Sequence, residues 1–171
     1  MPAPILPFDD YNLLISFLND EKCVDINLWQ QVEKFEELKS VKKGDCCFAD
    51  KSGIYAIIDN DGHIAYIGKA KCLHNRLSSH SWALVGKDAQ KAPTWDEFFT
   101  HFNGKNLIAR YFITPEFSDD RASEFARQAI ERALQIKYKP YFDELYSRKK
   151  DRLEDRFDGE LAVIKSRLEK I

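Results

Sequence analysis

The stretch GIYAIIDNDGHIAYIGKAKCLHNRLSSH, residues 53–80, decides the fold of this chain. Two runs rich in β-branched and aromatic residues, GIYAII and HIAYIG, are separated by DNDG, which is typical of a tight turn. The pattern predicts an antiparallel hairpin, followed by a helix over about residues 70–79. Because alternate side chains of a strand share a face, the hairpin can bring Tyr55 and Tyr66 side by side.

Chemically active side chains follow the hairpin. We expect Gly68 to end the second strand and Lys69 to stand at the entrance of the helix. Arg76 and His80 are four residues apart and therefore share one helical face. Two phenols, an ammonium, a guanidinium and an imidazole would then line one cleft, and this set lacks a carboxylate for a metal ion.

The N-terminal third of the chain predicts two helices. Asp9 or Asp10 can cap a short helix that carries apolar residues on one face. A second amphipathic helix is expected from apolar residues at helical spacing, namely Leu28, Val32, Phe35 and Leu38.

The C-terminal half predicts one more strand and three helices. Thr94 can cap a helix through WDEFFTHF, and NLIARYFI, residues 106–113, reads as the third strand. A long helix is expected from about Ser118 to Lys137, ending near Pro140 because proline disfavours helix in the residue before it. The tail from about Tyr146 is expected to form a second long helix.

The expected fold class is therefore α/β (α+β), with a small three-stranded sheet, antiparallel or mixed, flanked by helices. Residues 1–51 would form an N-terminal helical extension and residues 146–171 a C-terminal helix. The domain between them, residues 52–145, would hold the candidate site, with an insertion at about residues 81–105.

Composition limits the class of protein. The chain has 171 residues, 44% hydrophobic and 32% charged, enough for one buried core and atypical of membrane or disordered proteins. The N-terminus lacks the features of a secretory signal, so we expect a cytoplasmic protein. The four cysteines lack C-x-x-C spacing. Cys72 and His74 could be half of a zinc site, but the adjacent Cys46 and Cys47 are poorly placed to complete it.

Charge is unevenly distributed along the chain. The net charge is -2, and residues 1–51 hold six lysines against ten acids, which gives no general support to a nucleic-acid partner. Residues 69–91 instead hold five lysines and arginines against one acid. In this segment we expect contacts with DNA from four side chains, Lys71, His74, Lys87 and Lys91.

These motifs carry a resemblance to a known family. GIY at residues 53–55, YIG at 66–68 and the continuation KAKCLHNRLSSH resemble the GIY-YIG nucleases. They are particularly similar to the N-terminal incision domain of the bacterial excision-repair nuclease. The family also carries a glutamate on a later helix, followed twelve residues on by an asparagine, with a proline between. ERALQIKYKPYFD, residues 131–143, matches this pattern and identifies Glu131 as the counterpart of the catalytic acid.

Two positions depart from the family's pattern. The family's asparagine is Asp143 here, which keeps an oxygen acceptor and loses the amide donors. His80 stands where the excision-repair enzymes carry tyrosine, although other members use histidine. The resemblance covers about residues 52–143 and implies the GIY-YIG fold, a DNA substrate and an Mg²⁺ or Mn²⁺ cofactor. Gly53, Gly68 and Asp143 would support the site.

The residue types fit hydrolysis of a phosphodiester by a one-metal mechanism. Glu131 and a substrate phosphate could hold Mg²⁺, which keeps several of its waters. A tyrosine phenol has an ordinary pKa of about 10, but the charge of Lys69 would favour its ionised form, so Tyr66 is the candidate general base. Tyr55 would position it, and Arg76 would stabilise charge in the transition state. His80 would orient the water or share the proton transfer.

Two function classes remain open from the sequence. One is a stand-alone DNA endonuclease of repair, restriction-like or mobile-element type. A monomer with one active site would nick DNA, whereas double-strand cleavage would indicate a homodimer or two successive events. The other is a DNA-binding module of the same fold whose cleavage is weak or depends on a partner, which Asp143 and the acidic net charge would suit.

Overall fold

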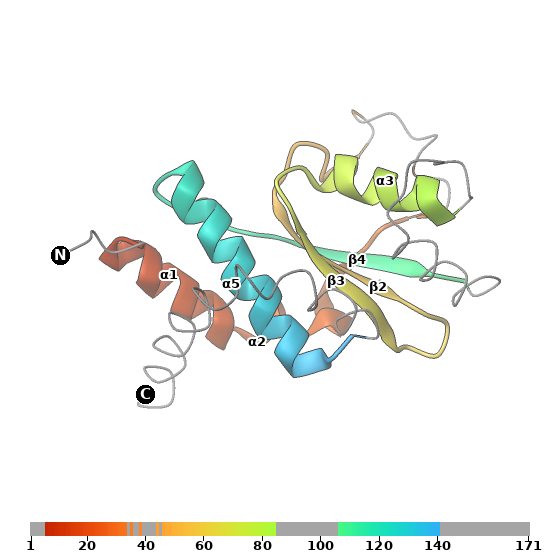
Figure 1. Ribbon diagram of the computed structural model, residues 1–171, viewed down its shortest axis with the longest axis horizontal. Helices are drawn as coiled ribbons and strands as arrows, with labels where there is room; N and C mark the ends of the chain where they lie inside the picture. The colour runs from red at the N-terminus through yellow and green to blue at the C-terminus, as the bar shows by residue number, and fades with distance from the viewer. Residues whose placement is uncertain are drawn as a thin grey trace, which may run out of the picture.

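The computed structural model describes residues 6–33, 35, 38, 44, 46–84 and 106–140. Within them the fold is of the α+β class, as predicted, with one antiparallel sheet in the order β1-β4-β2-β3 (Figure 1). The strands are β1 (Gln30–Gln31), β2 (Gly53–Ile58), β3 (Ile64–Ala70) and β4 (Ile108–Ile113). The helices are α1 (Phe8–Asn19), α2 (Glu21–Val24), the 3-10 turn η1 (Ile26–Leu28), α3 (Leu73–Leu84) and α5 (Asp120–Tyr138).

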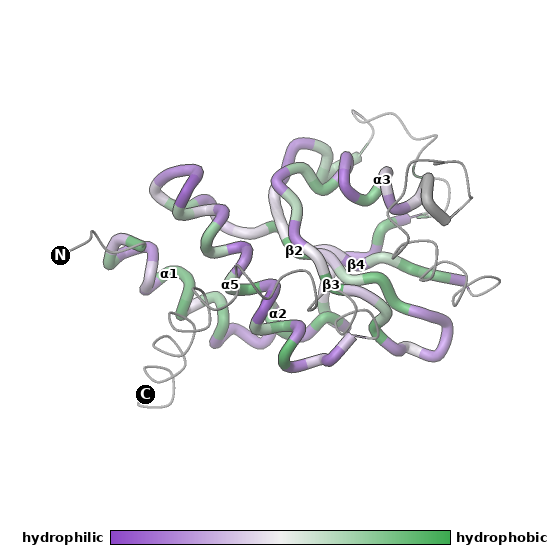
Figure 2. Tube along the Cα trace, viewed as in Figure 1, coloured by the Kyte–Doolittle hydropathy of each residue, from purple (hydrophilic) through white to green (hydrophobic). Residues whose placement is uncertain are grey.

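The predicted hairpin is present as β2 and β3. The Asp59 carboxylate closes the turn between the strands by accepting the backbone N–H groups of Asp61 and His63, both at 2.9 Å. Figure 2 shows this turn as a hydrophilic segment at the end of two more apolar strands. β4 pairs with the other edge of β2, which leaves β3 as the outermost strand on its side of the sheet.

The N-terminal segment corrects two expectations. The sheet has four strands rather than three, because Gln30 and Gln31 pair with β4. The second amphipathic helix is wrong over its first part, where the chain forms η1 and β1. Leu28 is 57% exposed, whereas the next residue, Trp29, is buried and its indole N–H donates to the Cys23 carbonyl at 3.0 Å. Pairing with β4 and burial of Trp29 thus outweigh the helical spacing of the apolar residues.

Two hydrophobic clusters lie on the two faces of the sheet. Figure 1 shows α1 and α5 on one side of the sheet and α3 on the other. The first cluster joins Leu14 and Phe17 of α1 to Ile54, Ile67 and other residues of the sheet and α5. The N-terminal extension therefore packs on the domain through the apolar face of α1.

Helix α5 has clear signals at both ends. The Asp119 side chain accepts the Ala122 N–H at 2.7 Å, and Lys139 ends the helix in the left-handed conformation, with φ of 47°. These bounds agree with the predicted helix to within two residues. The other helices expected in the C-terminal half, over residues 95–102 and beyond Tyr146, lie outside the described residues. No helix among the described residues is both long enough and apolar enough to span a bilayer.

Candidate active site

The two tyrosines of the hairpin lie on one face of the sheet. In the register of β2 and β3, Tyr55 stands opposite Gly68, and Tyr66 stands opposite Ile57. The tyrosines are therefore diagonal neighbours, and their ring centroids are 5.9 Å apart. The pairing predicted from strand alternation is confirmed.

Gly68 lies inside β3, because the strand continues to Ala70, so the prediction that it ends the strand is wrong. A Cβ atom at Gly68 would lie 2.4 Å from the Tyr55 hydroxyl oxygen. At Gly53 a Cβ atom would lie 2.2 Å from the Phe112 carbonyl oxygen of β4. Both positions therefore require glycine, because a side chain would clash with the Tyr55 phenol at Gly68 and with the neighbouring strand β4 at Gly53.

Helix α3 brings Arg76 and His80 onto Tyr55. The Tyr55 hydroxyl lies 2.7 Å from His80 Nε2, and Arg76 Nε donates to the same hydroxyl at 3.3 Å. Because Arg76 can only donate, the hydroxyl accepts from it and can give its own proton to a neutral His80. Tyr55 is fully buried and His80 is buried beside it.

Burial controls the protonation of Tyr55. Desolvation raises its pKa well above the ordinary value, while the Arg76 guanidinium opposes this rise. Burial alone would lower the pKa of Arg76, but charge interaction and hydrogen bonding with the phenols of Tyr55 and Tyr66 raise it above its usual range. Tyr55 therefore stays a neutral phenol and Arg76 stays a cation at physiological pH.

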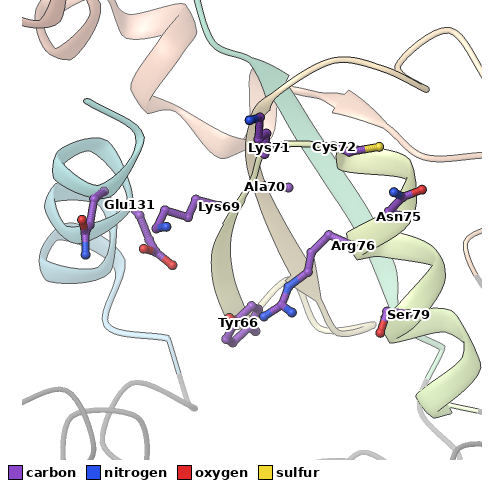
Figure 3. A pocket seen from close by; sticks show the side chains of 10 residues that line it. Tyr66, Lys69, Ala70, Lys71, Cys72, Asn75, Arg76, Ser79 and Glu131 are labelled. Carbon is purple, nitrogen blue, oxygen red and sulfur yellow. The ribbon is translucent and has the colours of Figure 1, made fainter. Parts of the chain in front are cut away.

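Tyr66 lies nearer the open edge of the sheet. Its ring centroid is 5.6 Å from that of His80, and its side chain lines a pocket of about 600 Å³ beside β3. The pocket is lined from β3, α3, the segment between them and α5 by Tyr66, Lys69, Ala70, Lys71, Cys72, Asn75, Arg76, Ser79, Gln128 and Glu131 (Figure 3).

Glu131 reaches this pocket from α5, which covers the other face of the sheet. Glu131 is only 5% exposed, and in Figure 3 its side chain lies across the pocket from Arg76. Tyr66 and Arg76 thus approach the edge of β3 from one face and Glu131 from the other. The structure brings Tyr66, Lys69, Arg76 and Glu131 to one pocket, with Tyr55 and His80 buried directly behind Tyr66 and Arg76.

Lys69 does not stand at the entrance of α3. It is the sixth residue of β3, opposite Ile54, and its ammonium forms an ion pair with Glu124 of α5. Arg127 donates to the other oxygen of Glu124 at 2.8 Å. The two cations lower the pKa of Glu124 although burial opposes the change.

Sequence reasoning missed the polar stripe of α5. Glu124, Gln128, Glu131 and Gln135 are spaced by four, three and four residues and therefore follow one side of a helix. The stripe meets β3 at both ends, through the ion pair of Glu124 and through Gln135, which donates to the Ile67 carbonyl at 3.3 Å. This spacing was visible in the sequence and identifies the helical face that carries Glu131.

The residues expected to contact DNA differ in how exposed they are. The Lys71 side chain is 78% exposed, and its ammonium lies 3.8 Å from Asp120. His74 is 9% exposed and packs near Phe48, which gives a phosphate little access to its ring. Lys87, Lys91 and Asp143 lie outside the described residues.

Possible metal ligands gather at two places. Among the described residues, the one group of three His, Cys, Asp or Glu side chains with closely spaced ligand atoms is Asp59, Asp61 and His63. It lies at the turn of the hairpin, where Asp59 already accepts two backbone N–H groups. Within the pocket the oxygen ligands are Glu131 and neutral side chains such as Ser79 and Gln128.

Comparison with protein families supports a relationship for the segment that carries the hairpin and α3. Residues 51–93 match the family model of the UvrC-like GIY-YIG domain. No curated protein matches the chain at a significant level. The match contains β2, β3 and α3, which carry five of the side chains described above: Tyr55, Tyr66, Lys69, Arg76 and His80.

Proposed function

The match to the UvrC-like domain assigns the chain to the GIY-YIG nuclease family, and from this premise we propose that the protein is a divalent-metal-dependent DNA endonuclease. Members of this family are usually nucleases, for which DNA is the substrate. The proposed reaction is hydrolysis of a phosphodiester bond at the pocket beside β3.

One observation carries the proposal. A candidate base, two cations and a carboxylate that are far apart in the sequence line the same pocket, namely Tyr66, Lys69, Arg76 and Glu131. Glu131 lies outside the segment that matches the family model, so its arrival at the pocket is independent support. A phosphate is an anion with several acceptor oxygens, and this lining offers it cationic donors.

The pocket residues fit a hard divalent cation. Mg²⁺ prefers oxygen ligands and keeps several waters, so it needs few carboxylates from the protein. Glu131 would hold it, with a phosphate oxygen of the substrate as a further ligand. When bound there, Mg²⁺ or Mn²⁺ supplies Lewis-acid charge that stabilises the leaving oxygen.

Tyr66 is the proposed general base. The guanidinium of Arg76 supplies positive charge beside its phenol, and such charge favours the ionised form. Arg76 therefore replaces Lys69 as the cation that would favour the ionised form of Tyr66, because the Lys69 ammonium is bound to Glu124. The water oxygen bonds to phosphorus as the bond to the leaving oxygen breaks, and a proton of the water passes to Tyr66.

The buried pair behind Tyr66 would orient these groups. Tyr55 is neutral and links Arg76 to His80 through its hydroxyl, so it can hold the guanidinium in place without taking a proton itself. Arg76 would then donate to phosphate oxygens as negative charge develops on them. Tyr55 and His80 are positioning residues in this scheme.

A plasmid assay tests the proposal. Supercoiled DNA is incubated with the protein, with and without Mg²⁺ or Mn²⁺, and nicked and linear products are measured. We expect metal-dependent cleavage that Glu131→Gln and Arg76→Ala slow by about 10²–10³ or more, with DNA binding retained. Glu21→Gln, which removes a carboxylate from α2, is the control and should cut like the wild type. Wild-type cleavage by Glu131→Gln would disprove a metal at Glu131.

The DNA-binding module remains the second candidate, because Asp143 replaces the family's asparagine and the net charge is -2. The same assay separates the two functions. A module would bind DNA and leave the plasmid supercoiled with either metal. If the protein is a weak nuclease, Asp143→Asn should leave its rate unchanged or raise it. Nicked product without linear product would favour a monomer over a homodimer.

A further inference from the structure

The side of α3 that lines the pocket carries two polar residues without a role in the proposed reaction, Asn75 and Ser79. Ser79 is four residues from Asn75 and three from Arg76, so the three side chains share one side of the helix. Figure 3 shows Asn75 near Cys72 and Ser79 further along α3, with Arg76 between them. Hydrogen-bonding groups therefore extend along the pocket wall on both sides of the Arg76 guanidinium.

Asn75 and Ser79 are both exposed, and neither forms a hydrogen bond or an ion pair with the residues that the structure describes. The Cys72 thiol of the same wall, in contrast, already donates to the Ala49 carbonyl at 3.0 Å. Ser79 lies in the interior of α3, where serine is less favourable than alanine because its hydroxyl competes for backbone groups. The two side chains thus add no visible stability to α3 and are free to bind a ligand in the pocket.

The spacing of the two side chains fits a strand of nucleic acid. An α-helix rises about 1.5 Å per residue, so Asn75 and Ser79 lie about 6 Å apart along α3. A DNA strand advances about 3.4 Å per nucleotide along the duplex axis, so this separation covers about two nucleotide steps. Neutral asparagine and serine side chains commonly donate to the phosphate and sugar oxygens of DNA. A strand whose phosphate meets Arg76 would therefore bring its neighbouring nucleotides to these side chains.

We propose that α3 carries a subsite for the DNA strand, in which Asn75 and Ser79 donate hydrogen bonds to backbone oxygens of the nucleotides that flank the scissile phosphate. This inference rests on the proposed function, which places the scissile phosphate at Arg76. The flanking nucleotides do not react, so the subsite binds the ground state and the transition state alike. It therefore contributes to affinity for DNA and not to the rate of the chemical step.

The test measures binding of a short fluorescent DNA duplex to the full chain by anisotropy, in EDTA so that metal-dependent cleavage does not occur. Asn75→Ala and Ser79→Ala should each raise the Kd about three- to tenfold, as expected for loss of one hydrogen bond to the backbone. Ser78→Ala is the matched control for Ser79, because the Ser78 hydroxyl lies 3.5 Å from His74 Nε2 and outside the pocket lining. Asn12→Ala, at an exposed position of α1, is the control for Asn75.

Salt dependence and DNA sequence identify the kind of contact. Neutral side chains displace no counterions, so Ser79→Ala should keep the wild-type slope of log Kd against log salt concentration, whereas Lys71→Met should lower the slope by about one. The loss in Ser79→Ala should be equal for duplexes of unrelated sequence, because backbone contacts carry no sequence information. A loss confined to one sequence would indicate a base contact and overturn the assignment. Ser79→Thr keeps the hydroxyl and should bind within about twofold of the wild type.

Kinetics and unfolding distinguish the subsite from a structural role. Ser79→Ala should raise KM and leave kcat unchanged, and its free energy of unfolding in urea should equal or exceed that of the wild type. A fall in kcat at constant KM would overturn the inference, because it would place Ser79 at the reacting centre.

The wild type tells the two levels of failure apart. If it binds no DNA, in EDTA or with Ca²⁺, the proposed function fails together with the inference. If it binds DNA and the alanine variants of Asn75 and Ser79 bind as tightly as their controls, the inference alone is wrong.

Discussion

Tyr55 and Tyr66 are the same residue type, yet their surroundings give them different chemistry. Tyr55 is fully buried, its pKa is raised by desolvation, and its hydroxyl is held by Arg76 and His80. Tyr66 faces the pocket. A proton acceptor must reach the attacking water and be able to ionise, and of the two tyrosines Tyr66 is the one that lines the pocket, although it too is only 5% exposed.

Substitution of each tyrosine by phenylalanine should separate these roles. Tyr66→Phe removes the proposed base and is expected to slow cleavage at least a hundredfold, within the range of about 10²–10⁴ for a positioned base. The wild-type rate should rise with pH as the phenol ionises, whereas the residual rate of Tyr66→Phe should be much less sensitive to pH. Single-turnover cleavage across a pH series measures both.

Tyr55→Phe is the counterpart in that experiment. It removes the hydroxyl from the buried nitrogen of His80 and from the partly buried hydrogen bond of Arg76, so we expect a loss of about 1–3 kcal/mol in the free energy of unfolding. Its cleavage rate should keep the pH dependence of the wild type. A wild-type pH profile in Tyr66→Phe would contradict the assignment of the base.

At the scale of elements, β3 is the component on which the site is built. Its residues face α3 on one side and α5 on the other, and Gly68 lies directly under the Tyr55 phenol. The strand thus sets the separation between Arg76 and Glu131.

Gly68→Ala should disturb this arrangement. The added methyl would lie 2.4 Å from the Tyr55 hydroxyl and 2.6 Å from a ring carbon of Tyr66, so both phenols must move. Overpacking of this kind costs about 1–3 kcal/mol, which urea unfolding would measure, and cleavage should fall with it. Gly44→Ala is the control because nothing lies within 4 Å of its Cβ position. Equal stability of the two variants would show that the phenols do not require a glycine at position 68.

The sequence predicts some of these elements better than others. The hairpin and α5 are found because the turn DNDG and the proline that follows the helix are local signals. Strand β1 is missed because it has two residues and depends on β4, which is far away in the chain. Lys69 is misplaced because the prediction ends the strand at Gly68, whereas this glycine lies inside β3 and makes room for Tyr55.

On the scale of the whole molecule, the N-terminal extension is part of the main core. Leu14 of α1 is completely buried in the same cluster as Ile130 of α5, the residue next to Glu131. Through this apolar contact the extension supports the helix that carries Glu131. Because the extension is acidic, it offers no surface attractive to DNA.

Neighbouring leucines of α1 test this role. Leu14→Ala should lower the free energy of unfolding by about 2–5 kcal/mol, whereas Leu13→Ala, at a position 36% exposed, should change it by less than about 0.5 kcal/mol. Thermal unfolding measures the difference. DNA affinity of the folded protein should be unchanged in both variants, and a loss of affinity in folded Leu14→Ala would argue that α1 contributes to DNA binding.

The short strand β1 has a consequence for solubility. β4 would otherwise end the sheet with a row of unpaired backbone groups, and such an edge can recruit strands from other chains into aggregates. Gln30 and Gln31 occupy part of that edge, and the Val32 N–H extends the cover by donating to the Ala109 carbonyl at 2.8 Å. We therefore expect proteolytic loss of this segment to cause aggregation, which would be seen as turbidity of the solution before any change in DNA cleavage could be measured.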